Sequence, residues 1–148
     1  MDWNHYRFHS LWQLPVPPAR AYAVLERAED YPRWWPQVRA VNRVDATTAV
    51  ITIRSLLPYG ITVTARETRH DPAAGVLEIA MSGDIDGWAR WSVTAAGPGT
   101  LARYDQVVDV NKPVLRRLAV PGRPFFRANH RLMMRAGRRG LVAYLEAV

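Results

Sequence analysis

The chain has 148 residues, a formal net charge of +7 and an apolar content of 49%. A chain of this length is expected to form one domain over residues 1–148 and to bury roughly two-thirds of its unfolded surface. Cysteine is absent, which excludes disulfide frameworks and thiolate chemistry. The polar residues 1–7 lack the apolar core of a signal peptide, and no apolar run approaches the ~18 residues of a membrane span. We therefore expect a soluble, cytoplasmic protein.

The first predicted element is a strand over residues 6–14. Its side chains alternate, so one face carries Tyr6, Phe8, Ser10, Trp12 and Leu14. The prolines that follow suit the first turn of a helix, and residues 19–27 are interpreted as a short one. A second short helix fits between two further prolines. It begins at Tyr31 or Pro32 and ends at Trp35.

From residue 37 to residue 111 the side chains alternate with a period of two, interrupted by turn-forming clusters. Strands are predicted near residues 38–45, 49–56, 61–70, 76–82, 87–95 and 101–110. The intervening turns are rich in Gly, Pro and Asp, and they cover residues 45–48, 58–60, 71–75, 83–87 and 96–99. Connections this short allow only antiparallel neighbours. With the first strand, the pattern predicts an antiparallel sheet of seven strands.

The longest helical pattern lies near residues 124–147. At about 100° per residue, its apolar stripe holds Phe126, His130, Met133, Met134, Gly137, Gly140, Leu141, Tyr144 and Val148. The opposite side carries Arg127, Arg131, Arg135, Arg138 and Arg139. Such a helix needs a large apolar surface to pack on, because propensity alone rarely holds a helix in water. A sheet curled around this helix would supply that surface and leave a cavity suited to an apolar ligand.

Several short segments, in this order of elements, carry a family resemblance. They are Val16-Pro17-Pro18, residues 30–36, Leu57-Pro58-Tyr59, residues 83–87 before a Trp-bearing strand, and Asn129-His130 with Met134, Gly137, Gly140 and Leu141. In these features the chain resembles the START/Bet v 1-like (SRPBCC) superfamily, and within it the bacterial branch of polyketide cyclase/dehydrase and lipid transport proteins. The resemblance implies an α+β helix-grip fold, in which a curved seven-stranded antiparallel sheet wraps around the long C-terminal helix and two short helices follow the first strand. It implies an internal cavity but no single activity, because this fold hosts transporters, receptors and cyclases.

The inner faces of these elements supply the residues expected to line the cavity. By strand register and helical position they are Phe8, Trp12, Ile53, Val63, Ile79, Met81, Trp91, Tyr104, Gln106, Phe126, Asn129, His130, Met133, Met134, Gly137 and Leu141. Most are apolar, and filling of the core explains their aromatic members equally well. Tyr104 and Gln106 would offer polar tips. Gly137 and Gly140 leave the helix bare, which either lets the sheet come close or leaves volume for a ligand.

His130 is the only group on the apolar stripe of the helix that ionises near neutral pH. Burial there would disfavour the cation, so the ring would act on a ligand as a neutral hydrogen-bond donor or as a general base. The alternative is a core histidine whose hydrogen bonds are satisfied by the protein. Asn129 beside it is interpreted as a polar partner or as a tie between sheet and helix.

The carboxylates give no metal or cofactor site. Asp84 and Asp86 lie in a glycine-flanked turn without further ligands nearby, so turn formation is expected for both. Glu67 and Glu78 lie in the middle of strands, where pairing with arginine on the outer face is expected and an ion pair at the cavity mouth is the alternative. The sequence lacks a nucleophile elbow, a phosphate-binding glycine loop, zinc spacing and a dinucleotide fingerprint. No catalytic residue is assigned.

The positive charge is concentrated in residues 112–148, where nine basic residues and one acid give +8. A solvated helix face is the simple explanation. The alternative is that Arg131, Arg135, Arg138 and Arg139 dock onto an anionic surface or an acidic carrier protein. Nucleic acid is not an expected partner, because no aromatic side chains interleave with the arginines to stack on bases.

Three functional hypotheses remain open, and the third is a membrane-surface protein that binds through the four arginines named above. The first is binding, or transport, of a small hydrophobic molecule such as a lipid or a polyketide-like compound in the cavity. The second, which the resemblance allows, is an aromatase/cyclase that acts on a carrier-bound polyketide. A cyclase should bring several polar groups together with an acid–base residue, whereas a carrier should have an almost wholly apolar cavity.

Overall fold

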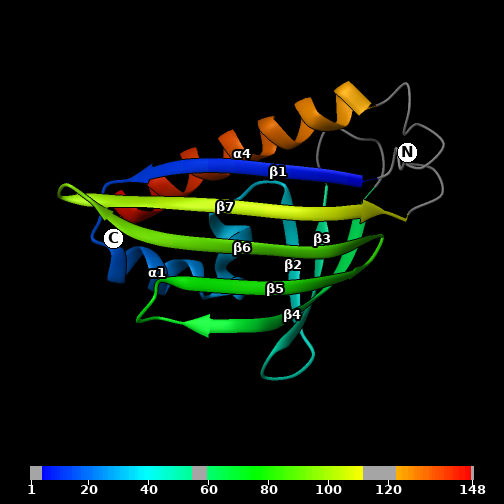
Figure 1. Cartoon of the computed structure of the whole chain (residues 1–148), viewed down its shortest axis with the longest axis horizontal. Coiled ribbons are helices and arrows are strands. Elements are labelled where there is room, and N and C mark those ends of the chain that lie inside the picture. The colour runs from blue at the N-terminus through cyan, green and yellow to red at the C-terminus, as the bar shows by residue number, and fades with distance from the viewer. Residues whose placement is uncertain (1–4, 55–59, 112–122, 148) are drawn as a thin grey trace.

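A computed structural model describes residues 5–54, 60–111 and 123–147 (Figure 1). Its elements in chain order are β1 (His5–Leu14), α1 (Pro18–Leu25), the 3₁₀ turn η1 (Ala28–Asp30), α2 (Tyr31–Trp34), β2 (Val38–Arg43), β3 (Thr48–Ile53), β4 (Ile61–Asp71), β5 (Val76–Gly83), β6 (Ile85–Ala96), β7 (Gly99–Val110) and α4 (Arg123–Glu146). The predicted Leu57-Pro58-Tyr59 segment, Val148 and the basic residues Lys112, Arg116 and Arg117 lie outside the described residues.

The strands form one antiparallel sheet of seven, in the order β1-β7-β6-β5-β4-β3-β2. Figure 1 shows β2 and β3 running at a steep angle to β6 and β7, so the sheet is strongly curved, with α4 lying along β1. The short helices α1 and α2 lie behind the sheet in the same view. This arrangement confirms the predicted helix-grip fold.

The predicted boundaries differ from the structure mainly at the turns. Only Asp84 separates β5 from β6, so the turn is much tighter than the predicted residues 83–87. Gly83 (φ 119°) and Gly87 (φ 148°) adopt conformations there that side chains disfavour. A Cβ atom at Gly87 would lie 1.9 Å from the carbonyl oxygen of Val107. The carboxylate of Asp84 accepts a hydrogen bond from the Thr62 amide at 2.8 Å, and that of Asp86 accepts one from the Gly83 amide at 3.1 Å. The prediction that both aspartates serve the turn is therefore confirmed.

The two faces of α4 follow the predicted pattern, with one addition. Arg127, Arg131, Arg135, Arg138 and Arg139 are all exposed. On the opposite face Leu145, which the predicted stripe omitted, is only 2% exposed. The buried face is wider at this end because α1 docks there, and the Arg20 guanidinium donates a 2.8 Å hydrogen bond to the Leu145 carbonyl oxygen.

Two apolar clusters form the core. One surrounds Trp12, whose ring packs edge-on against Trp34, Trp35 and Trp91 with centroids 6.2, 5.5 and 4.8 Å away. This cluster also holds Leu141 and Leu145 and fills the space beneath the C-terminal half of α4. The second cluster includes Tyr6, Val63, Met81 and Phe126, near the N-terminal half. No helix among the described residues is long and apolar enough to span a bilayer.

Candidate functional site

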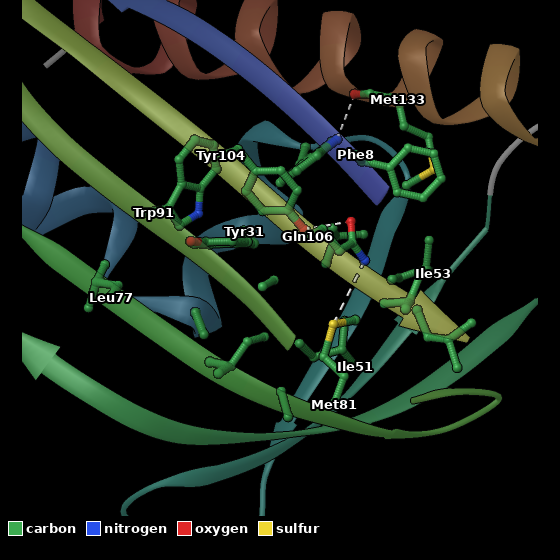
Figure 2. Close-up of a pocket in the computed structure, with 18 of the residues that line it drawn as sticks. Phe8, Tyr31, Ile51, Ile53, Leu77, Met81, Trp91, Tyr104, Gln106 and Met133 are labelled. Atoms are coloured by element: carbon green, nitrogen blue, oxygen red, sulfur yellow. Dashed lines mark hydrogen bonds between the residues drawn. The ribbon is translucent and has the colours of Figure 1, made fainter. Parts of the chain in front are cut away.

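A cavity of about 270 Å³ lies between the sheet and the N-terminal half of α4. Its apolar wall combines side chains from β3, β5 and β6, among them Ile51, Leu77 and Met81 (Figure 2). Tyr104 and Gln106 of β7 point into the same space, where they approach each other in Figure 2. The strand period of two explains this placement, since residues 104, 106 and 108 share one face of β7 and all line the cavity.

Most of the predicted lining residues surround this cavity. They are Phe8, Ile53, Ile79, Met81, Trp91, Tyr104, Gln106, Phe126, Asn129, His130, Met133 and Met134. They come from both ends of the sequence, and β1, β7 and α4 bring them together. Strand register and helical position were therefore sufficient to find this part of the lining.

Four predicted residues do not line the cavity, namely Trp12, Val63, Gly137 and Leu141. Val63 is covered within the cluster around Met81 and is only 1% exposed. Gly137 lies against the indole rings, because a Cβ atom there would be 2.6 Å from Cε2 of Trp35 and 2.9 Å from Cη2 of Trp12. Tryptophan rings thus fill the space beside this glycine. Trp12 and Leu141 belong to the same apolar cluster, beneath the C-terminal half of α4.

Tyr31 and Trp35 line the cavity although they were not predicted to do so. Both come from the short segment around α2, whose Pro-bounded sequence is too short to show a period. The Trp35 Nε1–H donates a 2.9 Å hydrogen bond to the Met133 carbonyl oxygen, and the Tyr31 hydroxyl donates one of 2.7 Å to the Leu25 carbonyl oxygen. The abundance of aromatic side chains in residues 31–35 was the available signal. Ile51, Leu77, Ala89 and Val108 are further lining residues outside the predicted set.

Three neutral polar side chains form a hydrogen-bonded network inside the cavity, and we call Tyr104, Gln106 and His130 the polar triad. The Oε1 atom of Gln106 accepts a hydrogen bond from the Tyr104 hydroxyl at 3.0 Å and lies 3.0 Å from Nε2 of His130. Because Oε1 is an acceptor, Nε2 of His130 must carry the proton. Among the described residues, the Gln106 amide nitrogen contacts only the Met81 sulfur, at 3.8 Å. Gln106 itself is just 7% exposed.

Burial keeps the polar triad uncharged. The pKa of His130 is lowered to about 4, because its buried position disfavours the imidazolium. Its ring stacks on Phe8 with centroids 3.7 Å apart, which adds an apolar neighbour on one side. The pKa of Tyr104 is raised, again because burial disfavours the charged form. At neutral pH the triad therefore presents dipoles and no formal charge.

We expect the free energy of unfolding to fall by roughly 2 kcal/mol as the pH drops from about 6.5 towards 4, through His130 alone. Between these pH values His130 is protonated in the unfolded chain but stays neutral in the folded protein. Its contribution to stability is therefore fully present above pH 6.5 and is lost as the pH falls towards 4. His70 acts in the opposite sense, because its pKa is raised by the hydrogen bond with Glu26. Urea titrations of the wild type and His130→Phe at matched pH isolate the contribution of His130. Parallel pH profiles for the two proteins would contradict it.

Charged side chains lie at the rim of the cavity. Glu26, Arg43, Glu67 and Arg69 are among its lining residues, and all four are exposed. Arg43 pairs with Glu29, and His70 pairs with Glu26 at 2.7 Å. Glu78 pairs with Arg90 at 3.3 Å, as the predicted pairing with arginine requires. Glu67 and Glu78 both line the cavity, so the prediction that they lie only on the outer face is not confirmed. Among the described residues, no group of three or more His, Cys, Asp or Glu side chains could hold a metal ion.

Comparison with solved structures shows that the fold is widespread. A START superfamily protein from Mycobacterium smegmatis aligns with a TM-score of 0.74 at 16% identity, covering 95% of this chain and 97% of the other. A protein from Thermus thermophilus gives 0.74 at 15% identity, covering 95% and 98%. The Zhui aromatase/cyclase from Streptomyces sp. R1128 gives 0.73 at 13% identity, covering 96% and 94%. No curated protein matches the chain in sequence.

The family assignment comes from the sequence of almost the whole chain. The family described as polyketide cyclase/dehydrase and lipid transport matches residues 9–146, from β1 through the end of α4. The matched region therefore includes the polar triad and most of the sheet and of the cavity wall. The chain belongs to the polyketide cyclase/dehydrase and lipid transport family, and its fold is similar to that of the START superfamily protein.

Proposed function

We propose that the cavity binds a small, uncharged and largely apolar molecule whose polar substituent meets the polar triad. The observation that carries this proposal is a network of three neutral, hydrogen-bonded side chains inside a space whose other lining side chains are mostly apolar. A volume of about 270 Å³ is close to the lower end of ligand sites in proteins, and it suits a ligand of one or two rings.

The triad favours particular substituents on the ligand. His130 uses Nε2 as a donor, which leaves the Nδ1 lone pair to accept a hydrogen bond from a ligand hydroxyl. The Gln106 amide has only a weak sulfur acceptor among the described residues, so a ligand carbonyl would be a better partner for it. A neutral ring that carries a hydroxyl or a carbonyl group therefore matches the site.

An anionic ligand matches it poorly. The basic lining residues Arg43 and Arg69 lie at the exposed rim, and His130 stays neutral at physiological pH. Moving a carboxylate into the apolar interior without a cationic partner costs several kcal/mol of free energy. Free fatty acids are accordingly disfavoured as ligands, while neutral aromatic or polyketide-like compounds are favoured.

A paired titration tests this proposal. We expect 2-naphthol to bind the cavity at least roughly tenfold more tightly than 2-naphthoate at pH 7, because the two differ mainly in the charge of the polar group. Competition with an apolar fluorescent probe reports both affinities in one assay. Tighter binding of the naphthoate would contradict the proposal.

The alternative function is an aromatase/cyclase acting on a carrier-bound polyketide. In favour of it, the cavity holds a neutral histidine with a basic ring nitrogen beside the Tyr104 hydroxyl, an arrangement that can move protons at a carbonyl compound. The fold similarity to the Zhui aromatase/cyclase also supports it. Cyclisation of a poly-β-ketone thioester that is lost in His130→Phe would favour the cyclase, whereas binding without turnover would favour the carrier.

We also propose that Arg131, Arg135, Arg138 and Arg139 dock the protein onto an anionic partner. All four side chains are exposed, as docking requires. Within the described parts of the chain none of them forms an ion pair. Their charge is therefore not neutralised by neighbouring acids in those parts of the fold.

A further inference from the structure

A second hollow, of about 220 Å³, lies between α4 and the neighbouring ends of β2 and β3. It is lined by Pro36, Gln37, Arg39, Arg54, Asn129, Leu132 and Met133. Asn129 and Met133 also line the ligand cavity, so the two spaces share a wall. The hollow is formed where the end of β3 and the start of β2 approach α4, and the Arg54 amide donates a 2.8 Å hydrogen bond to the Gln37 carbonyl oxygen there.

Two arginines give this hollow a positive charge. Arg39 and Arg54 are both exposed, and neither has an ion-pair partner among the described residues. Guanidinium groups bind phosphate oxygens in a two-pronged geometry that lysine cannot match. The hollow is therefore suited to a phosphate group.

Large apolar side chains are exposed beside it. Leu132, which lines the hollow, is 45% exposed, and Phe125 is 48% exposed. They are seven positions apart, so they lie on the same side of α4. Arg131 and Arg135 follow the adjacent side of the same helix and are exposed as well. This surface of α4 thus places cationic and apolar groups next to each other.

We propose that this surface, made of Arg39, Arg54, Phe125, Leu132, Arg131 and Arg135, docks onto a lipid bilayer that contains anionic phospholipid. A bilayer supplies partners for both kinds of group, with phosphate groups at the surface and acyl chains immediately below them. Helices with basic and apolar sides bind such interfaces through headgroup attraction together with shallow apolar insertion. Docking would bring the shared wall at Asn129 and Met133 close to the lipid. The inference rests on the proposed docking of the α4 arginines onto an anionic partner, and it does not depend on which ligand the cavity holds.

Flotation with vesicles tests the electrostatic part. Wild-type protein is expected to bind vesicles of phosphatidylcholine with phosphatidylglycerol and not vesicles of phosphatidylcholine alone. The double variant Arg39→Glu/Arg54→Glu should bind the anionic vesicles roughly 10- to 100-fold more weakly. The control is Arg7→Glu/Arg66→Glu, which changes the net charge equally at two exposed positions outside the proposed surface. Equal weakening in both double variants would overturn the proposal, as would a wild type that does not bind.

A second variant tests the apolar part. Phe125→Ser/Leu132→Ser keeps every charge, and it should weaken vesicle binding several-fold and make the remaining binding more sensitive to salt. Thermal melts confirm that each variant is folded. If this variant binds as tightly as the wild type, the two side chains do not insert into the bilayer and the apolar part of the proposal is wrong. Inorganic phosphate should release the protein no better than chloride at the same ionic strength, and specific release by phosphate would identify a soluble anion in place of the bilayer.

Discussion

Replacing Gly140 with alanine is expected to lower the free energy of unfolding by about 3 kcal/mol. A Cβ atom at this position would lie 1.6 Å from the carbonyl oxygen of Trp34 and 2.8 Å from its carbonyl carbon. These are backbone atoms of α2, so they cannot rotate away as a flexible side chain would. Relief requires α2 and α4 to separate, which would disturb the packing of the Trp35 ring beside the cavity. The gain in helix propensity, about 1 kcal/mol, does not offset this loss.

Urea denaturation measures the change in the free energy of unfolding that Gly140→Ala causes. The control is Arg139→Ala, one position earlier on the exposed side of α4, which should alter stability by no more than about 0.5 kcal/mol. A Gly140→Ala protein more stable than the wild type would show that propensity dominates. In that case the close approach of α2 to α4 would be wrong.

Replacing Gln106 with leucine is expected to cost about 2–4 kcal/mol of stability. The substitution keeps most of the bulk but removes the oxygen that accepts hydrogen bonds from Tyr104 and His130. Two buried donors would then lose their shared acceptor, and each unsatisfied group carries its own desolvation penalty. Denaturant titration of Gln106→Leu measures the total loss of stability from both unsatisfied donors.

The matched control removes the donors as well. In the triple variant Gln106→Leu/Tyr104→Phe/His130→Phe, no buried donor of the triad is left unsatisfied, so most of the lost stability should return. We call it the apolar triple variant. A single Gln106→Leu variant as stable as the wild type would mean that both donors have other acceptors, which would contradict the polar triad.

The sequence was sufficient to predict the sheet, because alternation and short turns leave few other arrangements. It also located Tyr104, Gln106 and His130 on inward faces. The hydrogen bonds among them were beyond prediction, because His130 and Gln106 are 24 positions apart and meet only when α4 packs against the sheet. A period identifies the face of an element on which a residue lies, but it does not identify the residue opposite.

The same limit explains the errors at the other end of the cavity. Trp12, Gly137 and Leu141 were placed along the cavity because their faces were correct, yet tryptophan rings occupy that space. Trp34 and Trp35 belong to a segment with no measurable period, so their inward orientation had no sequence signal beyond composition. The volume of a cavity depends on how much of the space large side chains occupy. Only the packed structure shows which part of the space stays empty.

The central claim is that a neutral polar triad in an apolar cavity selects an uncharged ligand. Its most direct test is the titration of 2-naphthol and 2-naphthoate against the wild type and the apolar triple variant. The account predicts that the wild type prefers the naphthol at least roughly tenfold and that the triple variant binds the naphthol more weakly by roughly tenfold, having lost the partners of its hydroxyl. Unchanged naphthol affinity in the triple variant, or a wild type that prefers the naphthoate, would contradict it.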